Sequence, residues 1–156
     1  MKTNTDTAIE KFLSGYNCAQ SVMFAHAAEA GIDPESALKA ATGFGGGIAR
    51  RGEMCGALTG GILAIGFKFG RGNGQDRTAT ERTYEKAQAL LREFERQHGS
   101  TTCRVLVDGC NFNTSGDKKK FKEQDLLHKR CVGCVKTVCE TLAGLLKEDA
   151  DGTIMD

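Results

Sequence analysis

The chain has no marked excess of either charge. Its 156 residues include 21 lysines and arginines against 20 aspartates and glutamates, which leaves a net charge of +1. This balance gives no electrostatic reason to expect nucleic acid or an anionic membrane surface as a partner. The most apolar stretch, residues 55–67, is too short to span a bilayer. The first residues lack a basic segment followed by an apolar one, so we expect no signal peptide and a soluble, cytoplasmic protein without membrane insertion.

Strand patterns are also missing, because no alternating run of β-branched residues reaches the length of a strand. Helical periodicity dominates instead. Helix-capping residues stand at Asn17 and at Asp33, which precedes the single proline, Pro34. We expect helices at residues 7–13, 17–31, 34–42, 55–69, 76–98, 103–106 and 130–147, and a polar surface loop at 109–120.

These patterns predict an all-α fold, a single-domain helical bundle of about five to seven helices. The domain covers residues 1–156, with its core at residues 8–147 and a frayed tail at residues 148–156. Two of the helices have a regular apolar face that we expect to be buried. The helix at 76–98 presents Tyr84, Ala87, Leu91 and Phe94, and the helix at 130–147 presents Val135, Val138, Leu142 and Leu145.

A glycine-rich stretch, FGGGIARRGEMCGALTGG at residues 44–61, raises the question of a phosphate-binding loop. A dinucleotide-binding loop follows a strand, but the residues before this stretch favour helix. The glycines at positions 43, 45, 46 and 47 also miss the G-x-G-x-x-G spacing, and no G-x-x-x-x-G-K-[ST] is present. The nucleotide interpretation therefore fails.

The same stretch is better explained as a loop that presents the thiol of Cys55. This cysteine lies where the loop becomes a helix, and the N–H groups of a helix start favour thiolate over thiol. Arg50 and Arg51 would act in the same direction, and Cys18 has the same local design after Asn17. The four-residue spacing of two glycines in the helix, at positions 56 and 60, predicts close packing of another backbone against one face.

The chain contains seven cysteines, an odd number that cannot pair completely within one chain. A static disulfide framework is not expected in a reducing cytosol. Each cysteine taken alone could be a small buried apolar side chain. For the set as a whole, we expect at least some of the cysteines to have a chemical role rather than only a packing role. The seven are Cys18, Cys55, Cys103, Cys110, Cys131, Cys134 and Cys139.

Two segments, GYNCAQSV at residues 15–22 and ATGFGGGIARRGEMCGALTGG at residues 41–61, resemble the C–GCAxxG–C–C family of redox-active proteins. The family's core motif corresponds to CGALTG at residues 55–60. HGSTTCRVLVDGC at 98–110 is similar to the third cysteine segment, and CVKTVCETLAGLL at 134–146 is similar to the C-terminal helix. The likeness extends over residues 8–147. The domain is also similar to the C-terminal part of split-Soret cytochromes, in which cysteines hold an iron–sulfur centre.

The resemblance implies four site cysteines: Cys18, Cys55, Cys103 and Cys134, with Cys110, Cys131 and Cys139 as alternatives for the fourth position. It also implies a [2Fe–2S] cluster, with zinc or no metal as the alternatives. Haem is not expected, because C-x-x-C at residues 131–134 is followed by valine rather than histidine. The three histidines, His26, His98 and His128, are too few to favour bis-histidine ligation.

Three functions remain open. The first is an oxidoreductase or electron-transfer protein whose thiolates ligate a metal centre, since soft thiolates suit iron–sulfur clusters and zinc. The second is a metal-free thiol–disulfide protein that uses Cys18 and Cys55 as its catalytic pair, or the Cys131-x-x-Cys134 motif. The third is an interaction module stabilised by zinc. The partner would be an unidentified redox protein, and the glycine-rich helix could pack against a second copy in a homodimer.

Overall fold

A computed structural model describes residues 1–147, and every regular element in this part of the chain is helical. The all-α prediction is therefore confirmed. The described residues form nine α-helices, one 3-10 turn and one π turn. Their bounds are α1 Asn4–Leu13, α2 Cys18–Ala25, α3 Ala27–Ala30, α4 Pro34–Ala41, η1 Thr42–Phe44, α5 Gly56–Phe69, α6 Arg77–His98, α7 Cys103–Leu106, α8 Ser115–Glu123, η2 Leu127–Cys131 and α9 Val132–Leu145.

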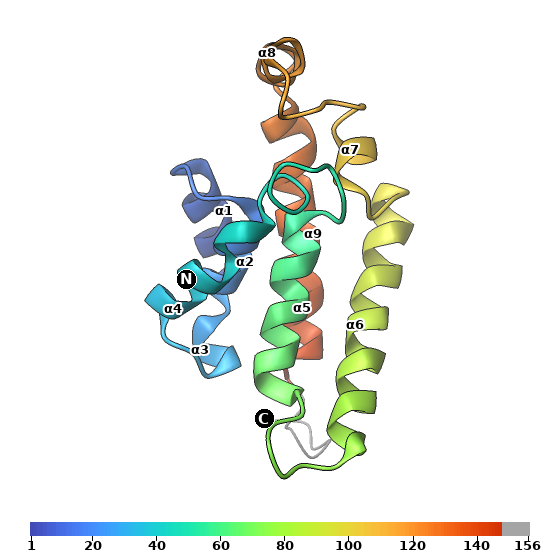
Figure 1. Ribbon diagram of the computed structural model, residues 1–156. Helices are drawn as coiled ribbons and strands as arrows, with labels where there is room; N and C mark the ends of the chain where they lie inside the picture. The colour runs from blue at the N-terminus through green and yellow to red at the C-terminus, as the bar shows by residue number, and fades with distance from the viewer. Residues whose placement is uncertain (148–156) are drawn as a thin grey trace.

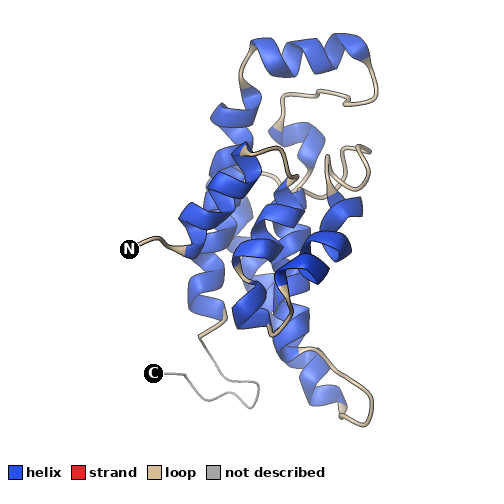
Figure 2. Ribbon diagram, turned by 90° about the vertical axis from the view of Figure 1, so that its left-hand side faces the viewer, coloured by secondary structure: helices blue, strands red, loops and turns tan. Residues whose placement is uncertain are grey.

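Three long helices, α5, α6 and α9, stand side by side and form the centre of the molecule (Figure 1). The short helices α1 to α4 cover one side of this centre, where α2 packs on α5 and α1 packs on both α2 and α9. The loop before α5, together with α7 and α8, gathers at one end of the long helices (Figure 1). There α8 lies crosswise to the bundle (Figure 2). None of the helices in residues 1–147 is long and apolar enough to cross a membrane.

The capping residues explain most of the helix starts. Asn17 and Gln20 form a reciprocal capping box at α2, and the Asp33 side chain accepts from Ser36 N–H ahead of Pro34 at α4. The first helix begins earlier than expected because Thr3 forms a second capping box at its start. The helix expected at 17–31 is interrupted after Ala25, and α3 continues it for one short turn.

Two sequence predictions were wrong in detail. Residues 109–120, expected to be a loop, contain most of α8, because the Thr114 side chain accepts from Asp117 N–H and caps the helix. Tyr84, expected on the buried face of α6, is 60% exposed. Phe94 is buried as predicted, and the buried face also contains Leu90 and Lys86. The tail predicted at 148–156 lies outside the described residues.

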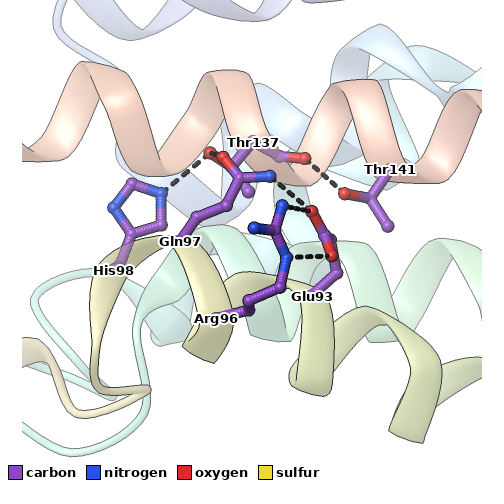
Figure 3. A network of polar contacts seen from close by, with 6 residues as sticks. All are labelled: Glu93, Arg96, Gln97, His98, Thr137 and Thr141. Carbon is purple, nitrogen blue, oxygen red and sulfur yellow. Dashed lines mark hydrogen bonds and ion pairs between the residues drawn. The ribbon is translucent and has the colours of Figure 1, made fainter.

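A polar network joins α6 to α9 (Figure 3). Gln97 of α6 donates from its Nε2 to the Glu93 carboxylate at 2.7 Å. This contact orients the Gln97 amide so that its Oε1 accepts from the Thr137 hydroxyl of α9 at 3.1 Å. Because the Thr137 hydroxyl gives its hydrogen to Gln97, its oxygen accepts from His98 Nε2 at 2.8 Å. Hydrogen bonds from Arg96 and Gln97 hold the pKa of the Glu93 carboxyl at about 2. These contacts fix the end of α6 against the first half of α9.

The close approach of α5 to α2 depends on two glycines, as the four-residue spacing predicted. A Cβ atom at Gly60 would lie 2.7 Å from the Ala19 carbonyl oxygen and 3.0 Å from Ala19 Cα. A Cβ atom at Gly56 would lie 3.2 Å from Cys18 Cβ. The backbone of α2 cannot move aside without disturbing its own hydrogen bonds, so both positions exclude a larger side chain.

Changing Gly60 to Ala should destabilise the protein by roughly 2 kcal/mol or more, because the added methyl group meets backbone rather than a flexible side chain. Gly66 lies on the same helix with nothing within 4 Å of its hypothetical Cβ atom, so it is the matched control. Gly66→Ala should stabilise the protein by about 0.5–1 kcal/mol through helix propensity alone. Urea unfolding of both variants checks this. Equal effects of the two changes would contradict the packing account.

His26, at the junction of α2 and α3, is fully buried, and its Nε2 atom has no hydrogen-bond partner in residues 1–147. Asn4 Nδ2 lies 3.4 Å from His26 Nδ1, and the Glu29 carboxylate lies 3.7 Å from the same atom. Burial lowers the pKa of His26, and the neighbouring Glu29 opposes this effect only in part. The imidazole is therefore held in its neutral form.

This burial predicts that acid destabilises the fold. An unfolded histidine titrates near pH 6.5, whereas the folded His26 titrates lower, so the unfolded state binds more protons between these values. The contribution of the neutral, buried His26 to the stability of the fold is complete above pH 6.5. It is lost as the pH falls through the lower pKa of His26 in the folded state. Urea unfolding between pH 7.5 and pH 5 should show a steeper loss for the wild type than for His26→Gln. Parallel curves would contradict the assignment.

Candidate thiol and metal site

Five cysteines line one cavity of about 450 Å³ at the end of the bundle where α7 and α8 gather. They come from four separate parts of the chain: Cys18, Cys55, Cys103, Cys131 and Cys134. The cavity thus contains all four cysteines that the family resemblance implied, and also one of the alternatives. All seven cysteines of the protein are free thiols, so the expected Cys18–Cys55 pair lines the same cavity without a disulfide.

Helix starts place three of these thiols. Cys18 is the first residue of α2, Cys55 is the N-cap residue of α5, and Cys103 is the first residue of α7. Close backbone contacts bring them together: a Cβ atom at Gly56 would touch Cys18, and a Cβ atom at Gly47 would lie 2.6 Å from Cys103 Cβ. Glycine at these two positions is therefore what allows the thiols to approach.

The loop before α5 is pinned to the segment before α7. Cys55 N–H donates to the Thr101 carbonyl at 2.9 Å, and Cys103 N–H donates to the Glu53 carbonyl at 2.6 Å. A single antiparallel bridge between Met54 and Thr102 lies between these two bonds. The relative position of Cys55 and Cys103 is thus set by backbone hydrogen bonds rather than by side-chain packing.

A left-handed turn forms one wall of the cavity. Five consecutive residues, Gly46 to Arg50, have φ angles between 47° and 70°. Three of them, Ile48, Ala49 and Arg50, carry side chains, and each such residue costs about 1–2 kcal/mol in this region. Backbone bonds compensate for this cost: Ala49 N–H donates to the Gly43 carbonyl, and Arg50 N–H to that of Gly45. Strain of this kind is concentrated at functional sites.

A π turn places the last two thiols. The turn at η2 ends at Cys131 and leads directly into α9, whose first turn contains Cys134. Short π segments are rare in proteins, and those that occur are often found at functional sites. The result is that both cysteines of the C-x-x-C motif line the cavity, together with Arg130.

Cys55 and Cys134 interact directly, and the hydrogen bond from the Cys134 thiol to the sulfur of Cys55 is the largest influence on the pKa of Cys55. This bond lowers the pKa of Cys55, and backbone N–H groups of Ala57 and Leu58 at the start of α5 add to the effect. The same bond raises the pKa of Cys134, and burial raises it further. The helix-start prediction for Cys55 is confirmed in direction, although Arg50 and Arg51 are not among the causes.

The other cavity thiols are held in their protonated form. Burial raises the pKa of Cys18 well above its usual value, and it raises the pKa of Cys103 and Cys131 to about 12. The predicted thiolate character of Cys18, based on its place at a helix start, was therefore wrong, since desolvation outweighs the helix terminus.

Two cysteines do not line the cavity. Cys110 is buried in a small apolar cluster with Val107 and Leu126. Cys139 is buried in the main core on α9, where burial and the nearby Glu140 and Glu29 carboxylates raise its pKa to about 12. Neither thiol lines the cavity, and both are buried among apolar side chains.

The cavity also contains residues that the sequence did not single out. Three phenylalanines and one arginine line it besides the cysteines: Phe12, Phe112, Phe121 and Arg130. Phe112 and Phe121 meet edge to face, with ring centroids 5.1 Å apart. No local pattern marks these residues, because they come from separate segments that meet at the cavity only after folding: α1, the loop before α8, α8 itself and the π turn.

The donor set suits a soft metal in kind and number, since five thiols face one cavity and four complete a zinc or iron–sulfur site. Within residues 1–147, no group of three or more cysteine, histidine, aspartate or glutamate side chains has the arrangement of ligands around one metal ion. The five thiols line the same cavity without forming such a group.

A family model described as "Putative redox-active protein (C_GCAxxG_C_C)" matches residues 16–145 of the chain. The match includes all five cavity cysteines. No curated protein and no solved structure matches the chain in the other two comparisons.

Changing Gly47 to Ala should disrupt the site, because the position has φ +70° and the new methyl group would overlap Cys103 Cβ and the Glu53 backbone. We expect a loss of more than about 1 kcal/mol in stability and faster alkylation of Cys103, measured by mass spectrometry. Gly43→Ala is the control, since no atom outside its immediate neighbours lies within 4 Å of the Cβ atom that this change adds. Unchanged Cys103 reactivity in Gly47→Ala would show that the turn does not position this thiol.

Proposed function

Because the chain belongs to the C–GCAxxG–C–C family of redox-active proteins, we propose that it transfers electrons through an iron–sulfur centre of the [2Fe–2S] type at the cysteine-lined cavity. The observation that supports this most strongly is the gathering of five thiols from four parts of the chain around one cavity. Thiolates are the usual ligands of iron–sulfur clusters, and four of them complete a [2Fe–2S] site.

The four ligands that we propose are Cys18, Cys55, Cys103 and Cys134. The fourth position favours Cys134 over Cys131, because Cys134 is only 3% exposed and already forms a hydrogen bond with Cys55. Cys131 is half-buried and becomes a fifth thiol beside the centre. Cys110 and Cys139 are not candidates, since neither lines the cavity.

A bound cluster would supply one-electron transfer, and the protein would supply its environment. The N–H groups of Ala57 and Leu58 stabilise negative charge at Cys55 Sγ. Apolar side chains of Leu106, Val107 and Leu127 line the cavity and limit the access of water to the thiolates. Hydrogen bonds to sulfur and exclusion of solvent are both means by which proteins set the reduction potential of a cluster.

A [2Fe–2S] centre suits the arrangement better than zinc. Four sulfurs around a zinc ion lie about 2.3 Å from a single point. A two-iron cluster divides its four thiolates between two metal atoms, so the ligands are spread more widely. We place such a protein in the cytoplasm with a redox protein as its partner.

A metal-free thiol–disulfide function is the second candidate, and the hydrogen bond between Cys55 and Cys134 favours it. In this reaction the two thiols lose two protons and two electrons to a two-electron acceptor as the S–S bond forms. Cys55 would be the attacking thiolate because it is the cavity thiol whose pKa is lowered.

Anaerobic purification followed by iron, acid-labile sulfide and zinc analysis, with an absorption spectrum, tests the main proposal. We expect two irons and two sulfides per chain, the composition of a [2Fe–2S] centre, and visible absorption that reductant bleaches. If the protein holds neither metal nor sulfide after anaerobic reconstitution, the thiol–disulfide function replaces the metal centre.

Changing Cys55 to Ser should abolish the cluster, because only three of the four proposed thiolate ligands remain and a serine oxygen is a harder ligand. Cys139→Ser is the control, since this thiol is buried away from the cavity. Cys139→Ser should retain full iron and sulfide content, although it is expected to lose some stability. Circular dichroism on both variants shows that the helices remain. Full iron in Cys55→Ser with loss of iron in Cys139→Ser would contradict the assignment.

A second pair of variants identifies the fourth ligand. Cys134→Ser should lose iron and sulfide as Cys55→Ser does, whereas Cys131→Ser should retain both, because Cys131 is the fifth thiol in this proposal. The reverse result, measured by the same metal and sulfide analysis, would assign the ligand to Cys131.

A further inference from the structure

The charged residues that line the cysteine cavity are both arginines, Arg50 and Arg130. Among the described residues, no aspartate, glutamate, lysine or histidine contributes to its lining. Asp108 pairs with Arg130 and lines with it a second cavity of about 270 Å³, but it does not line the main one. The lining of the main cavity thus contributes two cationic side chains and no carboxylate.

The left-handed turn holds Arg50 at the cavity. Its backbone is fixed from both sides, since its N–H donates to the Gly45 carbonyl at 3.0 Å and its carbonyl accepts from Asn113 Nδ2 at 2.9 Å. The side chain forms no ion pair within residues 1–147. Arg51 differs in both respects, because it pairs with Glu53 at 3.4 Å and does not line the cavity.

The π turn supplies the second arginine. Arg130 lies 3.5 Å from the Asp108 carboxylate, and both side chains are about half exposed, with 53% and 43% of their surface accessible. A pair so exposed contributes little attraction. A guanidinium has five N–H donors, so one carboxylate at this distance leaves donors available to a ligand.

The walls near these charges are apolar. Phe12 lines the cavity with Phe112 and Phe121, whose rings meet edge to face. The volume of about 450 Å³ lies within the range of cavities that bind small molecules. Two cations beside aromatic walls match a molecule with one anionic group and an apolar body.

We propose that the cavity binds a small organic carboxylate with its charge between Arg50 and Arg130 and its apolar body against the phenylalanines, next to the cysteine thiols. The redox role of this ligand, as a molecule that exchanges electrons with the centre, rests on the proposed function. The binding of the carboxylate does not rest on the proposed function, because the arginines and phenylalanines hold the molecule whether or not the thiols carry a metal.

The test is isothermal titration calorimetry on the full chain purified anaerobically, with benzoate as the probe and benzamide as its neutral counterpart. Benzoate should bind with an affinity at least about 10-fold higher than that of benzamide, since only the anion can pair with a guanidinium. Equal or weaker binding of benzoate would overturn the proposal on the wild-type protein alone, without any variant.

Substitutions then locate the site. Arg50→Gln and Arg130→Gln should each lower the affinity for benzoate by roughly 5- to 10-fold and leave that for benzamide unchanged. Arg51→Gln is the matched control and should bind benzoate as the wild type does. Tight benzoate binding that survives both cavity substitutions, or is lost in Arg51→Gln, would place the anion elsewhere and overturn the proposal.

Iron and sulfide are measured on the same samples, so the two proposals fail separately. Benzoate binding to a protein that takes up no metal would overturn the iron–sulfur function and leave the carboxylate site standing. A protein with its full cluster that does not distinguish benzoate from benzamide would overturn the carboxylate site alone.

Discussion

The close contact between the start of α5 and the start of α2 is the constraint on which the rest of the site depends. Gly56 and Gly60 leave no side chain between the two backbones, so Ala19 lies directly against α5. This contact brings Cys18 and Cys55, which are far apart in the sequence, to one cavity. The CGALTG motif thus has a structural role in its glycines and a chemical role in its cysteine.

The parts of the fold that could be predicted from the sequence are those determined by local interactions. The caps at Asn17 and Asp33 predicted helix starts close to those observed, because each acts on its own neighbouring N–H groups. The spacing of Gly56 and Gly60 likewise predicted close packing. The resemblance to the family supplied the cysteines, and four of them do line the cavity.

The parts that could not be predicted depend on contacts between distant segments. Nothing local marks five residues in the left-handed region when three of them have side chains, and the hydrogen bonds that hold this turn form only in the folded loop. The position of Arg130 depends on the π turn, and that of Phe121 on α8, which local sequence placed in a loop. Burial also reversed the expected thiolate character of Cys18, because desolvation outweighed the helix terminus.

Anaerobic reductive titration of the air-free protein, followed by electron paramagnetic resonance, tests the central claim most directly. A [2Fe–2S] centre at the cavity takes up one electron per chain and becomes paramagnetic when reduced. A disulfide among the same cysteines takes up two electrons and gives no paramagnetic signal. Uptake of one electron with a signal that is absent from Cys55→Ser is the result that this account predicts. Uptake of two electrons without a signal would contradict it.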